Sequence, residues 1–312
     1  MKEAVVNLQY RNIPRCNGAG NISVLGIGMG GMYGLPDETI EHIVRRAVVN
    51  GINIFDLCAG GINVFRPFGR AIRGERDKLK LIMHFGAGFD EFGQYEWIRD
   101  FDEIRRLFRW QLKELRTDYA DIGVLHCVDD DGDFESLRDD GILDYMKELK
   151  VKGVLRGLGF STHTPKVADR LLELGIFDVM MLRINPVEDW DTLDERARLM
   201  RRCRDMGVGA IAMRVFQGGR LLDESTSPFG MALTEPQCLQ YALDRTAVIS
   251  ALAGVQSLEQ LDALLGYERA AAEERDYSFV CRFKRVEESL AEKPKRPNNV
   301  VDIFSNKKNI AK

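Results

Sequence analysis

The side chains best suited to acid–base chemistry in this chain lie near the ends of apolar runs. Asp56 lies in "INIFDLC", His84 in "LKLIMHF" and His126 in "YADIGVLHC", each within the last three residues of its run. An imidazole takes up or releases a proton near neutral pH, and a neighbouring carboxylate stabilises its charged form. We therefore predict that Asp56, His84 and His126 are catalytic.

Eight apolar, strand-like runs carry these and other polar residues, and each is followed by a segment with helical periodicity. The runs cover residues 22–28, 52–58, 79–85, 119–127, 155–162, 178–185, 209–215 and 249–255. Nearly continuous apolar strands are typical of a parallel sheet whose outer face is covered by helices. Eight such units in about 250 residues predict an α/β fold, the closed (β/α)8 TIM barrel, with its chemistry at the carboxyl ends of the strands.

The same pattern predicts the domain organisation. Residues 1–266 are expected to form a single barrel domain that begins with a short N-terminal hairpin. Residues 267–312 start as a helix and then become polar, basic and rich in Pro and Asn. We expect a C-terminal helix followed by a partly disordered tail.

Composition limits the classes of partner and compartment. The 44 basic and 48 acidic residues are interspersed and give a net charge of −4, so neither nucleic acid nor a membrane is expected as a main partner. The six cysteines are scattered, without zinc-ligand spacing. With no secretory signal and no long apolar run, this predicts reduced thiols and a cytoplasmic protein. Nothing in the sequence indicates an oligomeric state.

The glycine-rich segment "GIGMGG" at residues 26–31 matches the G-x-G-x-x-G pattern of dinucleotide-binding domains. The following helix is expected to begin near Pro36, too late to place its N-terminus on a pyrophosphate. Eight even strand–helix units also do not fit a Rossmann domain followed by a substrate domain. The barrel remains the better interpretation.

Several long motifs, in order, resemble those of the aldo-keto reductases. "GINIFDLC" is similar to G-x-N-x-F-D-T-A, "LRTDYADIGVLHC" to L-x-x-D-Y-x-D-L-x-x-x-H, and "KGVLRGLGFSTH" to G-K-I-R-x-I-G-F-S. "GVGAIAMRVFQGGRLL" resembles the branch that carries a C-terminal iron–sulfur module. After residue 270 only Cys281 remains, so no iron–sulfur cluster is expected.

The resemblance implies NAD(P)H-dependent interconversion of a small carbonyl and its alcohol, by a tetrad of Asp, Tyr, Lys and His. Asp56 and His126 match two of the four. The tyrosine position is occupied by Gly61 and the lysine position by His84, so the tetrad is degenerate. Gly69 keeps the family's spacing from Asp56, so no insertion has displaced the tyrosine.

The resemblance also implies a cofactor site, formed by residues after the first, fifth, seventh and eighth strands. The candidate cofactor-binding residues are Gly28, Ser161, Thr162, Arg214, Gly254, Ser257 and Gln260. No Lys or Arg occurs between Gly254 and Arg269, so the usual clamp on a 2′-phosphate is missing. The sequence leaves the choice between NADP and NAD open.

Three interpretations remain. The chain is an oxidoreductase in which His126 or His84 acts as the acid, or an inactive family member that binds a nucleotide or a protein partner. The third is a cofactor-independent or metal-assisted lyase or isomerase that uses Asp56, His84, His126 and His163. No metal-binding motif supports a metal, so none is assigned.

Overall fold

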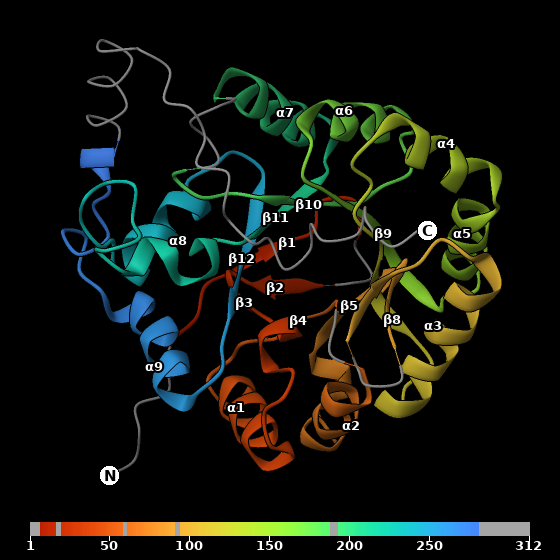
Figure 1. Ribbon diagram of the computed structural model, residues 1–312, viewed down its shortest axis with the longest axis horizontal. Coiled ribbons are helices and arrows are strands. Elements are labelled where there is room, and N and C mark those ends of the chain that lie inside the picture. Colours follow the sequence, from red (N-terminus) through yellow and green to blue (C-terminus); the bar gives the residue numbers. More distant parts are fainter. Residues whose placement is uncertain (1–6, 17–19, 59–60, 91–93, 188–192, 281–312) are drawn as a thin grey trace, which may run out of the picture. The chain divides into compact units, whose positions relative to one another are not determined.

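The computed structural model describes residues 7–16, 20–58, 61–90, 94–187 and 193–280, and its centre is a closed barrel of parallel strands (Figure 1). This confirms the predicted (β/α)8 fold and excludes the Rossmann interpretation. In order around the barrel the strands are β3 (Leu25–Gly28), β4 (Ile54–Leu57), β5 (Lys80–Phe85), β8 (Ala120–Leu125), β9 (Leu155–Thr162), β10 (Val179–Arg183), β11 (Gly209–Met213) and β12 (Val248–Gly254).

Helices surround the strands in Figure 1. They are α1 (Asp37–Val49), α2 (Gly61–Ala71), α3 (Phe101–Leu115), α4 (Asp131–Asp139), α5 (Ile142–Val151), α6 (Pro165–Glu173), α7 (Leu193–Met206), α8 (Glu235–Leu243) and α9 (Leu258–Gly266). Helix α3 shows why such segments are helical. Asp100 caps it by accepting a hydrogen bond from the Glu103 backbone, and Ile104, Leu107 and Phe108 form a buried stripe toward the strands.

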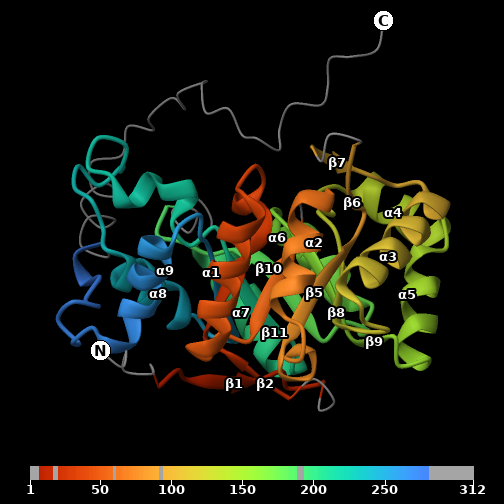
Figure 2. The ribbon, with the colours of Figure 1, turned by 90° about the horizontal axis from the view of Figure 1, so that it is seen from below.

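Two hairpins lie at opposite ends of the barrel (Figure 2). At the base, β1 (Tyr10–Asn12) pairs with β2 (Asn21–Ser23). At the mouth, β6 (Ala87–Phe89) pairs with β7 (Tyr95–Trp97). The predicted run 22–28 is thus divided between β2 and β3, and the Ser23 hydroxyl donates to the carbonyl of Leu25 across the bend between them. The mouth hairpin was not predicted.

The barrel interior is filled by its own side chains. Ile54, Ile82, Ile122 and Ile211 belong to a buried cluster separate from the larger core between strands and helices. A packed interior is normal for this fold, so the residues at the strand ends lie above a layer of closely packed side chains.

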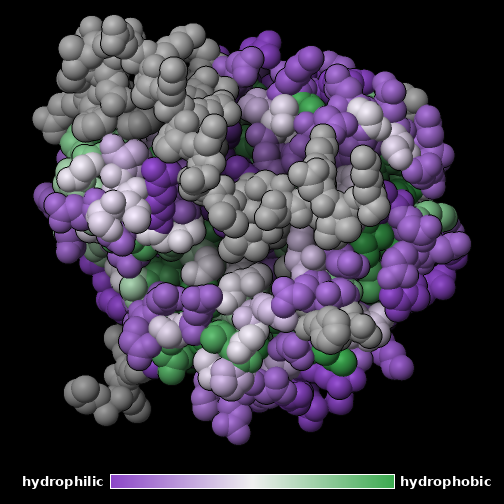
Figure 3. All heavy atoms as spheres, in the orientation of Figure 1, coloured by the Kyte–Doolittle hydropathy of each residue, from purple (hydrophilic) through white to green (hydrophobic). Residues whose placement is uncertain are grey.

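The compact unit extends to Tyr277, and residues 281–312, with most of the predicted tail and Cys281, lie outside the described residues. Among the described helices none is both long and apolar enough to cross a membrane. On the face shown in Figure 3, hydrophobic residues form small separate patches among hydrophilic ones.

Candidate active site

Asp56, His84 and His126 come from three strands that are neighbours in the barrel, and they meet at its mouth. Asp56 is in β4, His84 is in β5, and His126 directly follows β8. All three are buried. The Asp56 Oδ1 and His84 Nε2 atoms lie 2.8 Å apart, and the two Nδ1 atoms of His84 and His126 lie 2.9 Å apart. The predicted catalytic residues are therefore brought together.

Tyr95 extends this series, and sequence reasoning missed it. Its hydroxyl lies 2.7 Å from His126 Nε2, on the side of that ring away from His84. Tyr95 is the first residue of β7, in the hairpin that covers part of the mouth. The segment "FGAGFDEFGQYEW", with its spaced glycines and aromatic residues, is the only sequence signal for a hairpin here.

The hairpin is held by contacts that require a glycine. The Ile98 amide donates to the carbonyl of Gly86 at 2.9 Å. Gly86 has φ +106°, and a Cβ there would lie 2.4 Å from the Arg99 guanidinium. Gln94 on the hairpin donates from Nε2 to the Tyr33 hydroxyl at 2.6 Å, which places Tyr33 at the rim and not in the series with Asp56.

The hydrogen-bond partners fix the tautomers of both histidines. A carboxylate only accepts, so His84 Nε2–H donates to Asp56. In the state in which both imidazoles are neutral, each has one N–H, and His84 Nδ1 then accepts from His126 Nδ1–H. His126 Nε2 is then an acceptor and receives the Tyr95 O–H. In this state all the protons point the same way, from Tyr95 toward Asp56.

Burial dominates the electrostatics of the site. It lowers the pKa of His126 well below its ordinary value, and His84 and Arg99 lower it further. Burial raises the pKa of the Tyr95 phenol, and it raises the pKa of the Cys58 thiol with a further contribution from the charge of Asp56. The resting site therefore holds a neutral His126 with a protonated phenol and thiol beside it.

Arg99 fixes the chain that carries His126. Its guanidinium donates to the backbone carbonyls of His126 at 2.7 Å and Cys127 at 3.1 Å. It also pairs with Asp133 at 2.6 Å and lies 3.9 Å above the Trp97 ring. The His126 ring is thus anchored through its backbone.

The position of the family's tyrosine has a backbone conformation that disfavours one. Gly61 is buried, begins α2 and has φ +51°, a conformation that favours glycine. Gly69 fixes the register of the same helix, because a Cβ there would lie 2.6 Å from the carbonyl oxygen of Glu114 in α3. The helix therefore keeps its packing while the phenol is absent.

The candidate cofactor residues lie on the other arc of the mouth. Gly28 pairs in register with Gly254 on one side and Asp56 on the other, and a Cβ on Gly254 would meet nothing within 4 Å. Ser257 caps α9, and Gln260 Oε1 accepts from the amide of Gln256 at 2.8 Å. This part of the mouth is open.

The hydroxyl groups of Ser161 and Thr162 form hydrogen bonds within the protein. The Ser161 hydroxyl accepts from the Cys127 amide at 2.9 Å, and the Thr162 hydroxyl donates to Asp129 at 3.1 Å. Both are buried. Arg214 follows β11 with φ +58°, and its carbonyl accepts from Asn185. These three residues thus lie at the carboxyl ends of β9 and β11.

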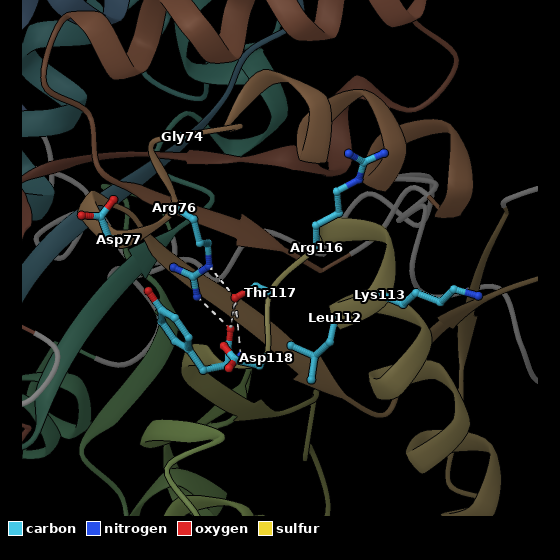
Figure 4. Close-up of a pocket in the computed structure, with 9 residues that line it drawn as sticks. Gly74, Arg76, Asp77, Leu112, Lys113, Arg116, Thr117 and Asp118 are labelled. Carbon is cyan, nitrogen blue, oxygen red and sulfur yellow. Dashed lines mark hydrogen bonds between the residues drawn. The ribbon is translucent and has the colours of Figure 1, made fainter.

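A surface hollow of about 640 Å³ lies at the wrong end of the barrel for catalysis (Figure 4). It is lined by residues that precede β5 and β8, and the side chains of Lys113 and Arg116 point away from the Arg76 guanidinium. Arg76 is already bound to Thr117. Since barrel chemistry occurs at the carboxyl ends of strands, we do not assign this hollow to the active site.

Comparison with known proteins agrees with the fold and the motifs. Residues 24–237 match the model of the aldo/keto reductase family. The chain is 26% identical over 275 residues to "Uncharacterized oxidoreductase YqkF" of Bacillus subtilis (strain 168), covering 78% of this chain and 87% of that protein.

Solved structures show the same architecture. The holo form of the aldo-keto reductase AKR11C1 from Bacillus halodurans superposes with a TM-score of 0.70 at 22% identity, covering 88% of this chain and 96% of that one. The putative aldo-keto reductase PA4992 from Pseudomonas aeruginosa gives 0.68 at 19% identity, with 86% and 98% covered. The chain belongs to the aldo/keto reductase family and is an oxidoreductase of that type.

Proposed function

We propose that this oxidoreductase reduces small carbonyl compounds with NAD(P)H, and that Tyr95 protonates the carbonyl oxygen. One observation carries the proposal: the continuous hydrogen-bonded series from Tyr95 through His126 and His84 to Asp56. It begins at a partly exposed phenol and ends at a buried carboxylate. We call this series the relay.

The relay can deliver a proton when it holds one more than in the resting state. With both ring nitrogens of His84 protonated, its Nδ1–H donates to His126 Nδ1, and His126 Nε2–H donates to the Tyr95 oxygen. The phenolic proton of Tyr95 is then no longer used within the relay. It can be donated to a carbonyl oxygen at the mouth.

Each proton then moves one position. Tyr95 gives its proton to the carbonyl oxygen and receives the His126 Nε2 proton. His126 receives the His84 Nδ1 proton on its own Nδ1. The relay returns to its resting hydrogen bonds, and solvent restores the proton on His84. Alcohol oxidation runs in reverse, starting with the Tyr95 oxygen as acceptor.

The same arrangement makes Tyr95, in place of His126 or His84, the acid that protonates the substrate. His126 lies behind Tyr95, and its depressed pKa leaves a neutral ring that is poorly suited to protonating substrate directly. We therefore assign His126 to transfer within the relay. Burying several polar groups costs free energy unless they are hydrogen-bonded, and all members of the relay are.

Bound NAD(P)H would supply the hydride. The open space at Gly254 beside Gly28 and the N-terminus of α9 fit a cofactor that must approach the backbone closely and carry phosphates. Arg46, which lies against α9, is bound to Asp262 at 2.8 and 3.0 Å. Arg46 is thus already paired, and no Lys or Arg occurs between Gly254 and Arg269 to bind a 2′-phosphate. We therefore propose that NADH is used at least as well as NADPH.

The test is turnover of small aldehydes and ketones, and of the matching alcohols, with each nicotinamide cofactor. Tyr95→Phe should lower kcat by about 10²–10⁴-fold, the usual contribution of a positioned acid, while the cofactor's dissociation constant stays unchanged. Tyr33→Phe is the matched control, since it removes the rim phenol outside the relay. Wild-type turnover in Tyr95→Phe, or no cofactor binding at millimolar concentration, would overturn the proposal.

A further inference from the structure

We propose that Cys58, His84 and His126 form a binding site for a divalent cation of the zinc type. Each offers one ligand atom, and these atoms lie within 4.8 Å of one another. The three residues follow or end the neighbouring strands β4, β5 and β8, so the barrel itself sets their positions. The site shares His84 and His126 with the relay, so it describes a second state of the same residues, and its evidence does not depend on carbonyl reduction.

The spacing of the ligand atoms is close to that of a tetrahedral zinc site. With Zn–N of about 2.0–2.1 Å and Zn–S of about 2.3 Å, two nitrogens lie roughly 3.3 Å apart and a nitrogen and a sulfur roughly 3.6 Å apart. The two Nδ1 atoms are 2.9 Å apart, and Cys58 Sγ is 3.8 Å from His126 Nδ1. These two distances are within a few tenths of an ångström of the tetrahedral values, and the remaining pair, Cys58 and His84, lies within 4.8 Å.

Both imidazoles already have the supporting contacts that metal-bound histidines show. A ligating histidine almost always donates its other N–H to a carboxylate or another acceptor, which fixes the ring and its tautomer. The Nε2 atom of His84 lies 2.8 Å from Asp56 Oδ1, and the Nε2 atom of His126 lies 2.7 Å from the Tyr95 oxygen. In both rings the nitrogen that remains, Nδ1, faces the centre of the cluster.

In the metal-bound state, the cation takes the place of the proton shared by the Nδ1 atoms of His84 and His126. The ring proton of His126 moves to Nε2 and is donated to Tyr95, so neither imidazole loses its single proton. Cys58 gives its thiol proton to solvent, and its thiolate binds the cation. The two Nδ1 atoms can therefore share a proton or bind a cation, but they cannot do both at once.

The ligand types select the metal. Imidazole and thiolate suit zinc and similar ions, whereas magnesium and calcium require oxygen ligands. A second cluster, Cys127, Asp129 and His163, lies nearby. There one imidazole, His163, is bound through Nδ1 to Asp129 at 2.8 Å, whereas the Cys58 cluster offers two imidazoles. The supporting contacts favour the Cys58 cluster.

The experiment uses the full-length protein freed of metal by a chelator and titrated with Co²⁺ or Zn²⁺ alone. We expect one ion per chain, with a thiolate-to-cobalt charge-transfer band that Zn²⁺ displaces. Cys58→Ser should remove the band. Asp56→Asn should weaken Zn²⁺ affinity by about 10–100-fold, as the loss of a supporting contact does.

Two controls isolate the cluster. Cys203→Ala removes a thiol that is buried against Met180, away from the mouth, and His163→Gln removes a ligand of the second cluster. Both should keep the charge-transfer band. If Cys58→Ser does not fold, His163→Gln decides, because a thiolate band kept in that variant does not depend on the complete second cluster.

Absence of Zn²⁺ binding in calorimetry, or a band that persists in Cys58→Ser, would overturn the proposal. A band lost in His163→Gln would assign the metal to the second cluster instead and would also overturn it. Metal binding is measured without cofactor or substrate, and carbonyl turnover is measured in chelator-treated protein. Failure of one proposal is therefore distinguishable from failure of the other.

Discussion

At the base of the barrel the buried carboxylate of Asp121 lies among fixed cations, whereas at the mouth the buried carboxylate of Asp56 faces an imidazole. Asp121 is 2.9 Å from Arg76 and 3.1 Å from Arg156, and it accepts the Leu81 amide at 3.0 Å. Asp56 has His84 at 2.8 Å. Both carboxylates are buried, but Asp121 is paired with arginines and Asp56 with a histidine.

The difference separates a structural cluster from a reactive one. A guanidinium does not release its proton in a protein, so the charges of Arg76 and Arg156 beside Asp121 are permanent and can only hold strands together. An imidazole has two nitrogens and can accept a proton on one while releasing it from the other. The mouth therefore has a path for a proton where the base has none.

The largest effect on activity is expected from His84→Gln. Glutamine can still donate a hydrogen bond to Asp56, but it cannot accept a proton on one atom and release it from another. We expect kcat to fall by about 10²–10⁴-fold, while the free energy of unfolding changes little. Steady-state kinetics and denaturant unfolding measure the two quantities.

His42→Gln is the matched control, because His42 is exposed on α1 and is not a member of the relay. Its kcat should equal that of the wild type. Equal loss of activity in His84→Gln and His42→Gln would contradict the proton path that distinguishes the mouth from the base.

The next effect is expected at the base, and on stability alone. Asp121→Asn leaves Arg76, Arg156 and the buried Lys80 facing one another without a carboxylate. Removing one partner of a buried ion pair typically costs about 3–5 kcal/mol of folding stability, and we expect the lower end because Arg156 is a third exposed. Thermal or denaturant unfolding tests this, and kcat at a temperature where the variant is folded should be unchanged. A selective loss of kcat would contradict the structural role.

The strands could be predicted from sequence because each is a short apolar run between polar segments. Seven of the barrel strands lie within their predicted ranges, and β12 begins one residue earlier. The division of 22–28 into β2 and β3 was not predicted, and it coincides with a contact between the Ser23 side chain and the backbone of Leu25. Local periodicity does not carry such information.

The site was predictable only in part, for a related reason. Asp56, His84 and His126 end neighbouring strands, so the fold brings them together once the strands are known. Tyr95 lies in a loop hairpin, and its position depends on the close approach of Gly86 to Arg99. The hydroxyl partners of Ser161 and Thr162 are likewise set by tertiary contacts.

The smallest effect is expected from Gly61→Tyr, which restores the family's tyrosine at its own position. Gly61 has φ +51°, and a residue with a side chain there costs about 1–2 kcal/mol. Because the position is also buried, the strained helix start should not present the new hydroxyl where a carbonyl could use it. We expect lower stability and no gain in kcat, with Gly61→Ala as the control that has the same strain and no phenol. Recovery of activity by Gly61→Tyr in a Tyr95→Phe background, but not by Gly61→Ala, would show that the original donor position still works, and that the hairpin phenol is not its only replacement.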